Sequence, residues 1–196
     1  MTAATTLADL LAHAPRFAGG PWPFHAVDPP TWRRTVEALA EGRISLVSLW
    51  GEEGEVNLAV MEEGAGAAVL SLPCPDGDFP SVGARHAPAI RLERKVRDLF
   101  GLVPDGAVDT RPWLAHGRWR GGAPPSRRDV TAPASSAPYA FLPVEGEGLH
   151  QIPVGPVHAG IIEPGHFRFA ANGETVVRLE ARLGYTHRGL EALMAG

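Results

Sequence analysis

The stretch "RISLVSLWGEEGEVNLAVME", residues 43–62, reads as two β-strands joined by a short turn. Its first half is rich in strand-forming residues, and its second half alternates apolar and polar side chains more clearly. Glu52, Glu53 and Gly54 supply the turn. A third strand candidate, "AAVLSLPCP" at residues 67–75, ends in a pair of prolines. These strands decide the fold class, because helices must cover them to bury a core.

Helical patterns flank the three strands. A helix-start signal, Asp-Pro-Pro-Thr, occupies residues 28–31. The apolar residues Trp32, Val36 and Leu39 follow at roughly one-turn intervals, and Gly42 ends this helix. The sequence therefore predicts an α+β protein whose main part is a small α/β sandwich.

A second helix is predicted within "RHAPAIRLERKVRDLFG", residues 85–101, with Gly101 as its stop. Its charged residues allow two i,i+4 pairs, Glu93 with Arg97 and Arg94 with Asp98. The helix is locally basic. Two interpretations remain open: a solvated amphipathic face, or a face that docks an acidic partner. Nucleic acid is disfavoured as the partner, because no aromatic residues interleave with the basic ones.

Composition narrows the class of protein further. The chain has 196 residues, a net charge of -4 and one cysteine, Cys74. A single thiol excludes an internal disulfide framework and a self-contained iron–sulfur cluster ligated by cysteine. No apolar run approaches the roughly 20 residues that a membrane span requires, and the N-terminus does not resemble a secretory signal. Any membrane association is therefore expected to be indirect, through a partner.

The sequence predicts four segments. Residues 1–24 form an N-terminal extension with a short amphipathic stretch that contains Leu7, Leu10 and Leu11. Residues 25–118 form the α/β domain. Residues 119–138, dominated by glycine, proline, serine and alanine, form a linker. Residues 139–196 form a second unit.

The second unit is predicted to contain a β-hairpin, "HFRFAANGETVVRLEAR" at residues 166–182, with its turn at Asn172-Gly173. Val176 and Leu179 are expected to lie opposite the alternating apolar residues of the first strand. A helix is expected from Thr186 or His187, with Leu190 and Leu193 facing inward. Since a lone hairpin is marginally stable, this unit is expected to be the start of a larger domain.

A loop rich in glycine and proline, "GPVHAGIIEPGHFRF" at residues 155–169, precedes the hairpin and carries His158 and His166. Judged by composition alone, such loop histidines are more often satisfied structural residues. A metal site is disfavoured, because the eight-residue spacing of His150, His158 and His166 matches no zinc motif.

Two stretches carry a family resemblance. "LERKVRDLFGL", residues 92–102, resembles the ER-x-x-x-DLFG signature of the C subunit of respiratory complex I, the NADH–quinone oxidoreductase. The loop, the hairpin and the following "GYTHRGLE" resemble the N-terminus of the complex I D subunit and the large subunits of membrane-bound, energy-converting NiFe hydrogenases. Their order resembles the fused C/D arrangement of formate hydrogenlyase and hydrogenase-4 type complexes.

The resemblance implies roles for particular residues. His166 matches the loop histidine at the head of the quinone cavity, where it would bind the quinone carbonyl and supply a proton as the catalytic residue. His158 matches the earlier histidine of that quinone-cavity loop, which shapes the turn. Arg188 matches an arginine near the terminal iron–sulfur cluster of a partner subunit, and would raise the potential of that cluster. The signature residues Glu93, Arg94 and Asp98 would fix their helix against partner subunits.

The resemblance also implies a complex. The expected partners are an iron–sulfur subunit of the complex I B-subunit type and other subunits, on the cytoplasmic side of the inner membrane. The chain has none of the C-x-x-C pairs that bind nickel and iron, so it should bind no cofactor and show no redox activity alone. Quinone or Ni–Fe would belong to the full complex. The alternative is a non-catalytic α/β protein-interaction scaffold.

Overall fold

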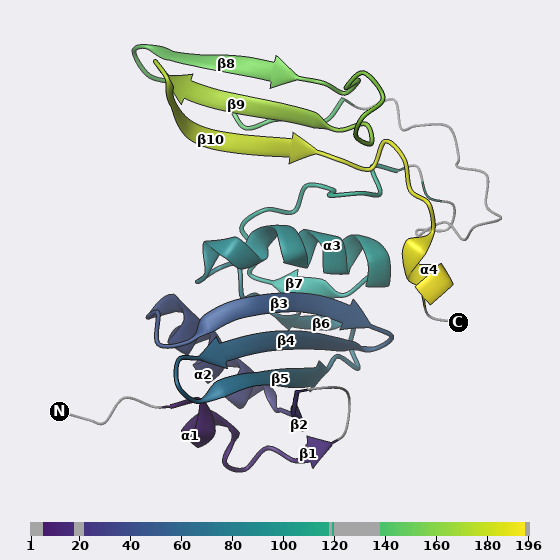
Figure 1. Ribbon diagram of the computed structural model, residues 1–196. Helices are drawn as coiled ribbons and strands as arrows, with labels where there is room; N and C mark the ends of the chain where they lie inside the picture. Colours follow the sequence, from purple (N-terminus) through teal and green to yellow (C-terminus); the bar gives the residue numbers. More distant parts are fainter. Residues whose placement is uncertain (1–5, 18–21, 118, 120–137, 195–196) are drawn as a thin grey trace. The chain divides into compact units, whose positions relative to one another are not determined.

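The computed structural model describes residues 6–17, 22–117, 119 and 138–194 (Figure 1). The chain divides into two units, Met1–Arg111 and Pro112–Gly196, which we describe separately. Both contain sheets, so the α+β class is confirmed. Within the described ranges, no helix is both long enough and apolar enough to cross a membrane.

The first unit is built on a five-stranded sheet with the order β1-β2-β5-β4-β3. The three long strands pair antiparallel in the predicted places, and β2 adds to β5 in parallel. Neither β1 nor β2 was predicted from the sequence. The strands are β1 (Arg16–Phe17), β2 (Phe24–Ala26), β3 (Ser45–Glu52), β4 (Glu55–Glu62) and β5 (Gly66–Pro73).

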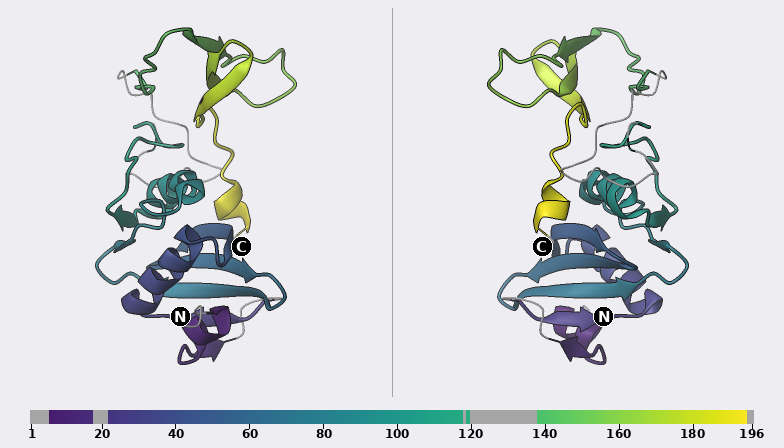
Figure 2. Two further views of the ribbon diagram at one scale, coloured as in Figure 1. Left: turned by 90° about the vertical axis from the view of Figure 1, so that its left-hand side faces the viewer. Right: turned by 90° about the vertical axis from the view of Figure 1, so that its right-hand side faces the viewer.

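Two helices cover one face of this sheet, α2 (Pro29–Ala40) and α3 (Ile90–Phe100) (Figure 2). The Asp28 side chain caps α2 by accepting from the Thr31 N–H at 2.8 Å. Trp32 of α2 is fully buried, and its indole N–H donates to the carbonyl of Pro80 at 2.9 Å. Gly101 ends α3 in the left-handed conformation, as predicted.

Short elements complete the first unit. Helix α1 (Leu7–Leu11) buries Leu7, Leu10 and Leu11 in the same apolar core as the sheet. The stretch expected as part of an extension therefore belongs, in the structure, to the first unit. The remaining elements are β6 (Asp78–Pro80), a 3-10 turn η1 (Ala87–Ala89) and β7 (Val103–Asp105), which pairs with β6 in parallel.

The second unit holds a three-stranded antiparallel sheet, β8 (Leu149–Val154), β9 (His166–Asn172) and β10 (Thr175–Arg182), in the order β10-β9-β8. The hairpin is confirmed, with Val176 opposite Ala171 and Leu179 opposite Phe169. The sequence did not predict β8, which supplies the third strand that stabilises a hairpin.

The C-terminal helix differs from the prediction. It is a single short turn of chain, α4 (Leu190–Met194), and begins later than Thr186 or His187. The expected inward orientation is wrong, because Leu190 is 57% exposed and Leu193 53% exposed. The first unit ends at Arg111, whereas the sequence predicted a domain boundary after residue 118. Residues 120–137 of the predicted linker lie outside the described ranges.

Candidate functional site

The loop between β8 and β9 is held by its own hydrogen bonds. The His158 Nε2–H donates to the Gly165 carbonyl at 2.6 Å, and the Gly165 N–H donates to the Pro156 carbonyl at 3.3 Å. A β-carbon on Gly155, whose φ is +90°, would meet the His158 ring at 2.7 Å. His158 therefore braces the loop from inside, with its Nε2 already committed to the backbone.

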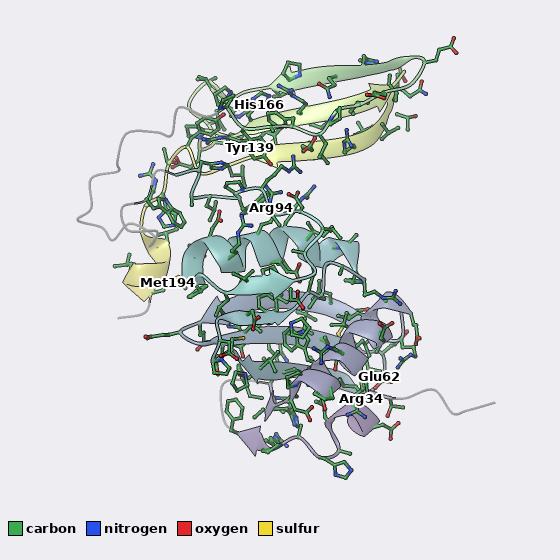
Figure 3. The ribbon with its side chains drawn as sticks, turned by 180° about the vertical axis from the view of Figure 1, so that it is seen from behind. Arg34, Glu62, Arg94, Tyr139, His166 and Met194 are labelled. Atoms are coloured by element: carbon green, nitrogen blue, oxygen red, sulfur yellow. The ribbon has the colours of Figure 1, made fainter. Side chains whose placement is uncertain are left out.

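His166 begins β9, directly after the braced loop (Figure 3). Its ring lies 4.8 Å from the ring of Phe141, and its Nε2 is buried without a hydrogen-bond partner among the described residues. Burial lowers the pKa of His166, and the positive charges of Arg168 and Arg182 lower it further. The imidazole is therefore expected to be neutral at pH 7.

Arg168 lies two residues further along β9, on the same face as His166, and sequence reasoning missed it. Its guanidinium carbon lies 4.0 Å from the centre of the Phe141 ring, a cation–π contact. Its Nε is buried and, like His166 Nε2, has no hydrogen-bond partner in the described part of the chain. Alternate residues of a strand lie on the same face, so a strand beginning at His166 places Arg168 beside it. This is the sequence signal that could have identified Arg168.

Phe141 belongs to a segment, residues 139–143, that runs across this face of the sheet; we call it the strap. The Leu142 N–H donates to the Glu180 carboxylate at 3.0 Å. Arg178 donates to the carbonyls of Leu142 and Pro143, at 3.2 and 2.6 Å. The strap is thus tied to β10 by three hydrogen bonds, and it holds Phe141 over His166 and Arg168.

The strap also borders a cavity of about 310 Å³ beside this pair. Two residues after Arg168, Ala170 contributes to its wall, but neither His166 nor Arg168 lines it. The His166 Nε2 and the Arg168 Nε are buried and do not face this cavity. The residues that line the cavity are Pro143, Val144, Glu145, Leu149, Ala170, Val177 and Arg178.

Arg188 pairs with Glu163, a loop residue that sequence reasoning did not single out. The guanidinium donates to Glu163 Oε1 at 2.9 and 2.5 Å, and the Thr186 hydroxyl donates to Oε2 at 2.9 Å. The hydrogen bond from Thr186, then that from Arg188, lower the pKa of Glu163. This exposed pair ties the loop to the segment after β10. Among the described residues, no direct contact joins Arg188 to His166.

In the first unit, the Glu93 carboxylate is buried against the loop before α3. It accepts from the N–H groups of Val82 and Gly83, at 2.5 and 3.0 Å, and from the Ser81 hydroxyl at 3.0 Å. Burial raises the pKa of Glu93, although these donors oppose the effect. The predicted ion pair with Arg97 is wrong, because the carboxylate points instead toward this loop.

The side chain of Arg94, labelled in Figure 3, is 5% exposed. Its guanidinium binds residues beyond α3. Its Nε–H donates to the Arg111 carbonyl at 2.8 Å, and its Nη1 lies 3.2 Å from the Asp109 carboxylate. Burial tends to raise the pKa of Asp109, but hydrogen bonds from Arg111 and the charge of Arg94 lower it overall. Asp98, also buried, lies 3.8 Å from Arg97. The contacts given above join the signature side chains to residues of the first unit.

These features define a class of protein. It has an α+β domain in which helix α3 carries the buried charged residues Glu93, Arg94 and Asp98, and a second sheet in which the loop between β8 and β9 carries His158. Residues 26–136 match the family described as "Respiratory-chain NADH dehydrogenase, 30 Kd subunit". The chain belongs to this family. The resemblance drawn from the two sequence stretches is confirmed.

Curated relatives extend the likeness to hydrogenase components and to C/D subunits. The chain is 37% identical over 123 residues to hydrogenase-4 component G of Escherichia coli, covering 59% of this chain and 22% of the relative. It is 37% identical over 124 residues to formate hydrogenlyase subunit 5 of the same organism, with the same coverage. To the C/D subunit of the NADH-quinone oxidoreductase of Methylococcus capsulatus it is 30% identical over 149 residues, covering 63% and 25%.

The chain thus spans about a quarter or less of the length of these relatives. Among solved structures, a trypsin-resistant fragment of Nqo5 is similar, with 21% identity and a TM-score of 0.43. That likeness covers 50% of this chain and 90% of the fragment.

Proposed function

We propose that the chain is a subunit, or the N-terminal part of a subunit, of a membrane-associated oxidoreductase complex of the NADH–quinone oxidoreductase and energy-converting hydrogenase superfamily. Membership of the 30 kDa family and the fused relatives support this assignment. In this proposal the first unit is an assembly platform, and the loop between β8 and β9 forms the rim of the redox cavity.

The observation that carries the proposal is the state of His166. It stands at the end of a braced loop, its pKa is lowered, and its buried Nε2 has no partner among the described residues. A neutral imidazole can donate a hydrogen bond to a carbonyl oxygen and then pass on a proton, which suits a group that meets a quinone. His158, whose Nε2 is bonded to Gly165, acts by shaping the loop.

Arg188 is proposed to lie near the iron–sulfur cluster of the partner subunit. Its guanidinium is 70% exposed at the side chain, which leaves it accessible to a neighbouring protein. The pair with Glu163 fixes its direction. A positive charge at that place would favour the reduced, more negative cluster and raise its potential.

The partners follow from the same proposal. They are an iron–sulfur subunit of the complex I B-subunit type and further subunits of the complex, on the cytoplasmic side of the inner membrane. With Cys74 as its single thiol, this chain lacks the ligands for a cluster, so the cluster belongs to the partner. Quinone or Ni–Fe chemistry belongs to the complete assembly.

The test uses the native complex purified with His166→Ala in this chain. Electron transfer should fall at least about tenfold, measured as reduction of a soluble quinone and, separately, as hydrogen evolution. The set of proteins in the purified complex should stay unchanged. His150→Ala, an exposed histidine on β8, is the control and should keep full activity. Unchanged turnover in the His166 variant would favour the non-catalytic scaffold instead.

A further inference from the structure

The face of the second sheet beneath the strap carries more positive than negative charge. Arg168, Arg178 and Arg182 share this face with one carboxylate, Glu180. Glu180 accepts from the Leu142 N–H and lies 3.8 Å from Arg178. The carboxylate is therefore directed toward the strap and Arg178.

Within the described part of the chain, the Arg168 Nε lacks such an acceptor. The guanidinium instead contacts the face of the Phe141 ring, while the buried Nε has no hydrogen-bond partner. A guanidinium keeps its charge at any physiological pH, so burying part of it without an acceptor costs free energy. The same holds, at smaller cost, for the neighbouring Nε2 of His166. Two buried nitrogens without a partner, on one face of one strand, are what a polar ligand could satisfy, with His166 donating from Nε2 in the matching tautomer.

We propose that Arg168 and His166 form one binding site for an anionic oxygen, a carboxylate or phenolate, beneath the ring of Phe141. Residues two apart on a strand lie about 6–7 Å apart on the same face, so one small ring-bearing ligand can reach both donors. The ring of Phe141 contacts both residues, with its face toward the Arg168 guanidinium and tilted by 48° to the His166 ring, and it could stack on a flat ligand.

The charges around the site explain why an anion fits better than a neutral group. Positive charges on Arg168 and Arg182 lower the pKa of His166. An anion bound to Arg168 would cancel part of this field and raise that pKa, which couples anion binding to proton uptake by the imidazole. The ionisable groups around the imidazole are Arg168 on β9, Arg178, Glu180 and Arg182 on β10, and Tyr139 beside Phe141.

The site deepens the proposed function, and it rests on that function in one respect: the physiological ligand would be the phenolate oxygen of a reduced, quinone-type acceptor. Arg168 would then be a second binding residue of the cavity rim, beside His166. The anion site itself can be tested on the full chain without any turnover.

The experiment titrates the full chain with benzoate and follows His166 by NMR, assigned by comparison with His166→Asn. Benzoate should raise the pKa of His166, whereas benzyl alcohol, a neutral ring of similar size, should not. Arg168→Gln should weaken benzoate binding by at least about tenfold, the usual value of a charged hydrogen bond. Arg16→Gln, which removes the same charge from β1, should bind as the unaltered chain does.

No benzoate-dependent shift of His166, or an equal shift in Arg168→Gln, would overturn the proposal. Arg168→Lys is the control for a folding defect, because lysine keeps the charge but lacks the planar set of donors. This variant should also bind benzoate more weakly, while its thermal unfolding stays unchanged. In the purified complex, benzoate should compete with the quinone. Binding that depends on Arg168 but does not compete would uphold the anion site and contradict the proposed cavity rim.

Discussion

The two units of the chain use their charged side chains in different ways. In the first unit, Glu93 and Arg94 are buried and bound to backbone groups and to Asp109. In the second unit, His166 and Arg168 keep buried donors that have no partner among the described residues. A buried polar group with its partners helps to define a fold, whereas a buried nitrogen without a partner costs stability, a cost that the proposed ligand would offset.

The two units also differ in how their apolar core is built. The helices of the first unit cover the sheet residues that form its core. On the second sheet, the face opposite the strap carries Ile152, Val154 and Leu179, which are 38–45% exposed. Val47 and Met61 of the first sheet are also 50% and 48% exposed, so the two units differ in the helix-covered core of the first and not in apolar exposure as such.

The largest effect is expected from Arg94→Ala. Removing this guanidinium leaves the Arg111 carbonyl and part of the Asp109 charge buried without their donor, which should lower the free energy of unfolding of the first unit by about 3–5 kcal/mol. Denaturant unfolding monitored by tryptophan fluorescence measures this. Lys95→Ala, on the exposed side of the same helix, should change little. An equal loss of unfolding free energy in the two variants would contradict the claim that buried charged groups stabilise the first unit.

A smaller, local effect is expected from Gly155→Ala. The added β-carbon would meet the His158 ring and the Gly165 carbonyl at a φ of +90°, at a cost of about 1–3 kcal/mol to the loop. Gly160→Ala is a matched control, because its φ is +79° but nothing lies within 4 Å of the new carbon. Hydrogen exchange of the loop amides should accelerate more in the first variant. The same protection in both would show that His158 does not brace the loop.

The smallest effect concerns the pH dependence of stability through Glu93. Its folded pKa is raised above the ordinary value of 4.5, so the folded state binds its proton more tightly than the unfolded state. Its contribution is therefore fully present below pH 4.5 and is lost as pH rises through the raised pKa. Relative to Glu93→Gln, the unaltered chain should lose stability over that range. A difference that is flat, or of opposite sign, would contradict the stated cause, burial.

The sequence predicted most of the fold because its strongest patterns are local. The strands β3 to β5, the helices α2 and α3 and the Asn172-Gly173 hairpin all follow from periodicity and turn residues. The strands β2 and β8 were not predicted. Strand β2 has three residues, and β8 contains Pro153, a residue that is tolerated because β8 lies at the edge of its sheet.

The candidate site was only half predictable. His158 and His166 stood out because histidines are rare in a loop of glycine and proline. Arg168 did not stand out, because its role depends on its contact with the ring of Phe141. Phe141 lies 27 positions earlier in the chain, and the strap brings the two together. In the same way, the sequence pattern did not reveal the ion pair of Arg94 with Asp109, because Asp109 lies beyond β7 and outside the helix.

The decisive experiment is the turnover of the native complex carrying His166→Ala, divided by the amount of assembled complex, beside the same ratio for Arg94→Ala. We predict that His166→Ala assembles normally and loses turnover per complex at least about tenfold. Arg94→Ala should lose assembled complex while each remaining complex keeps its turnover. Full turnover per complex in His166→Ala would contradict the claim that the second unit forms the rim of a redox cavity.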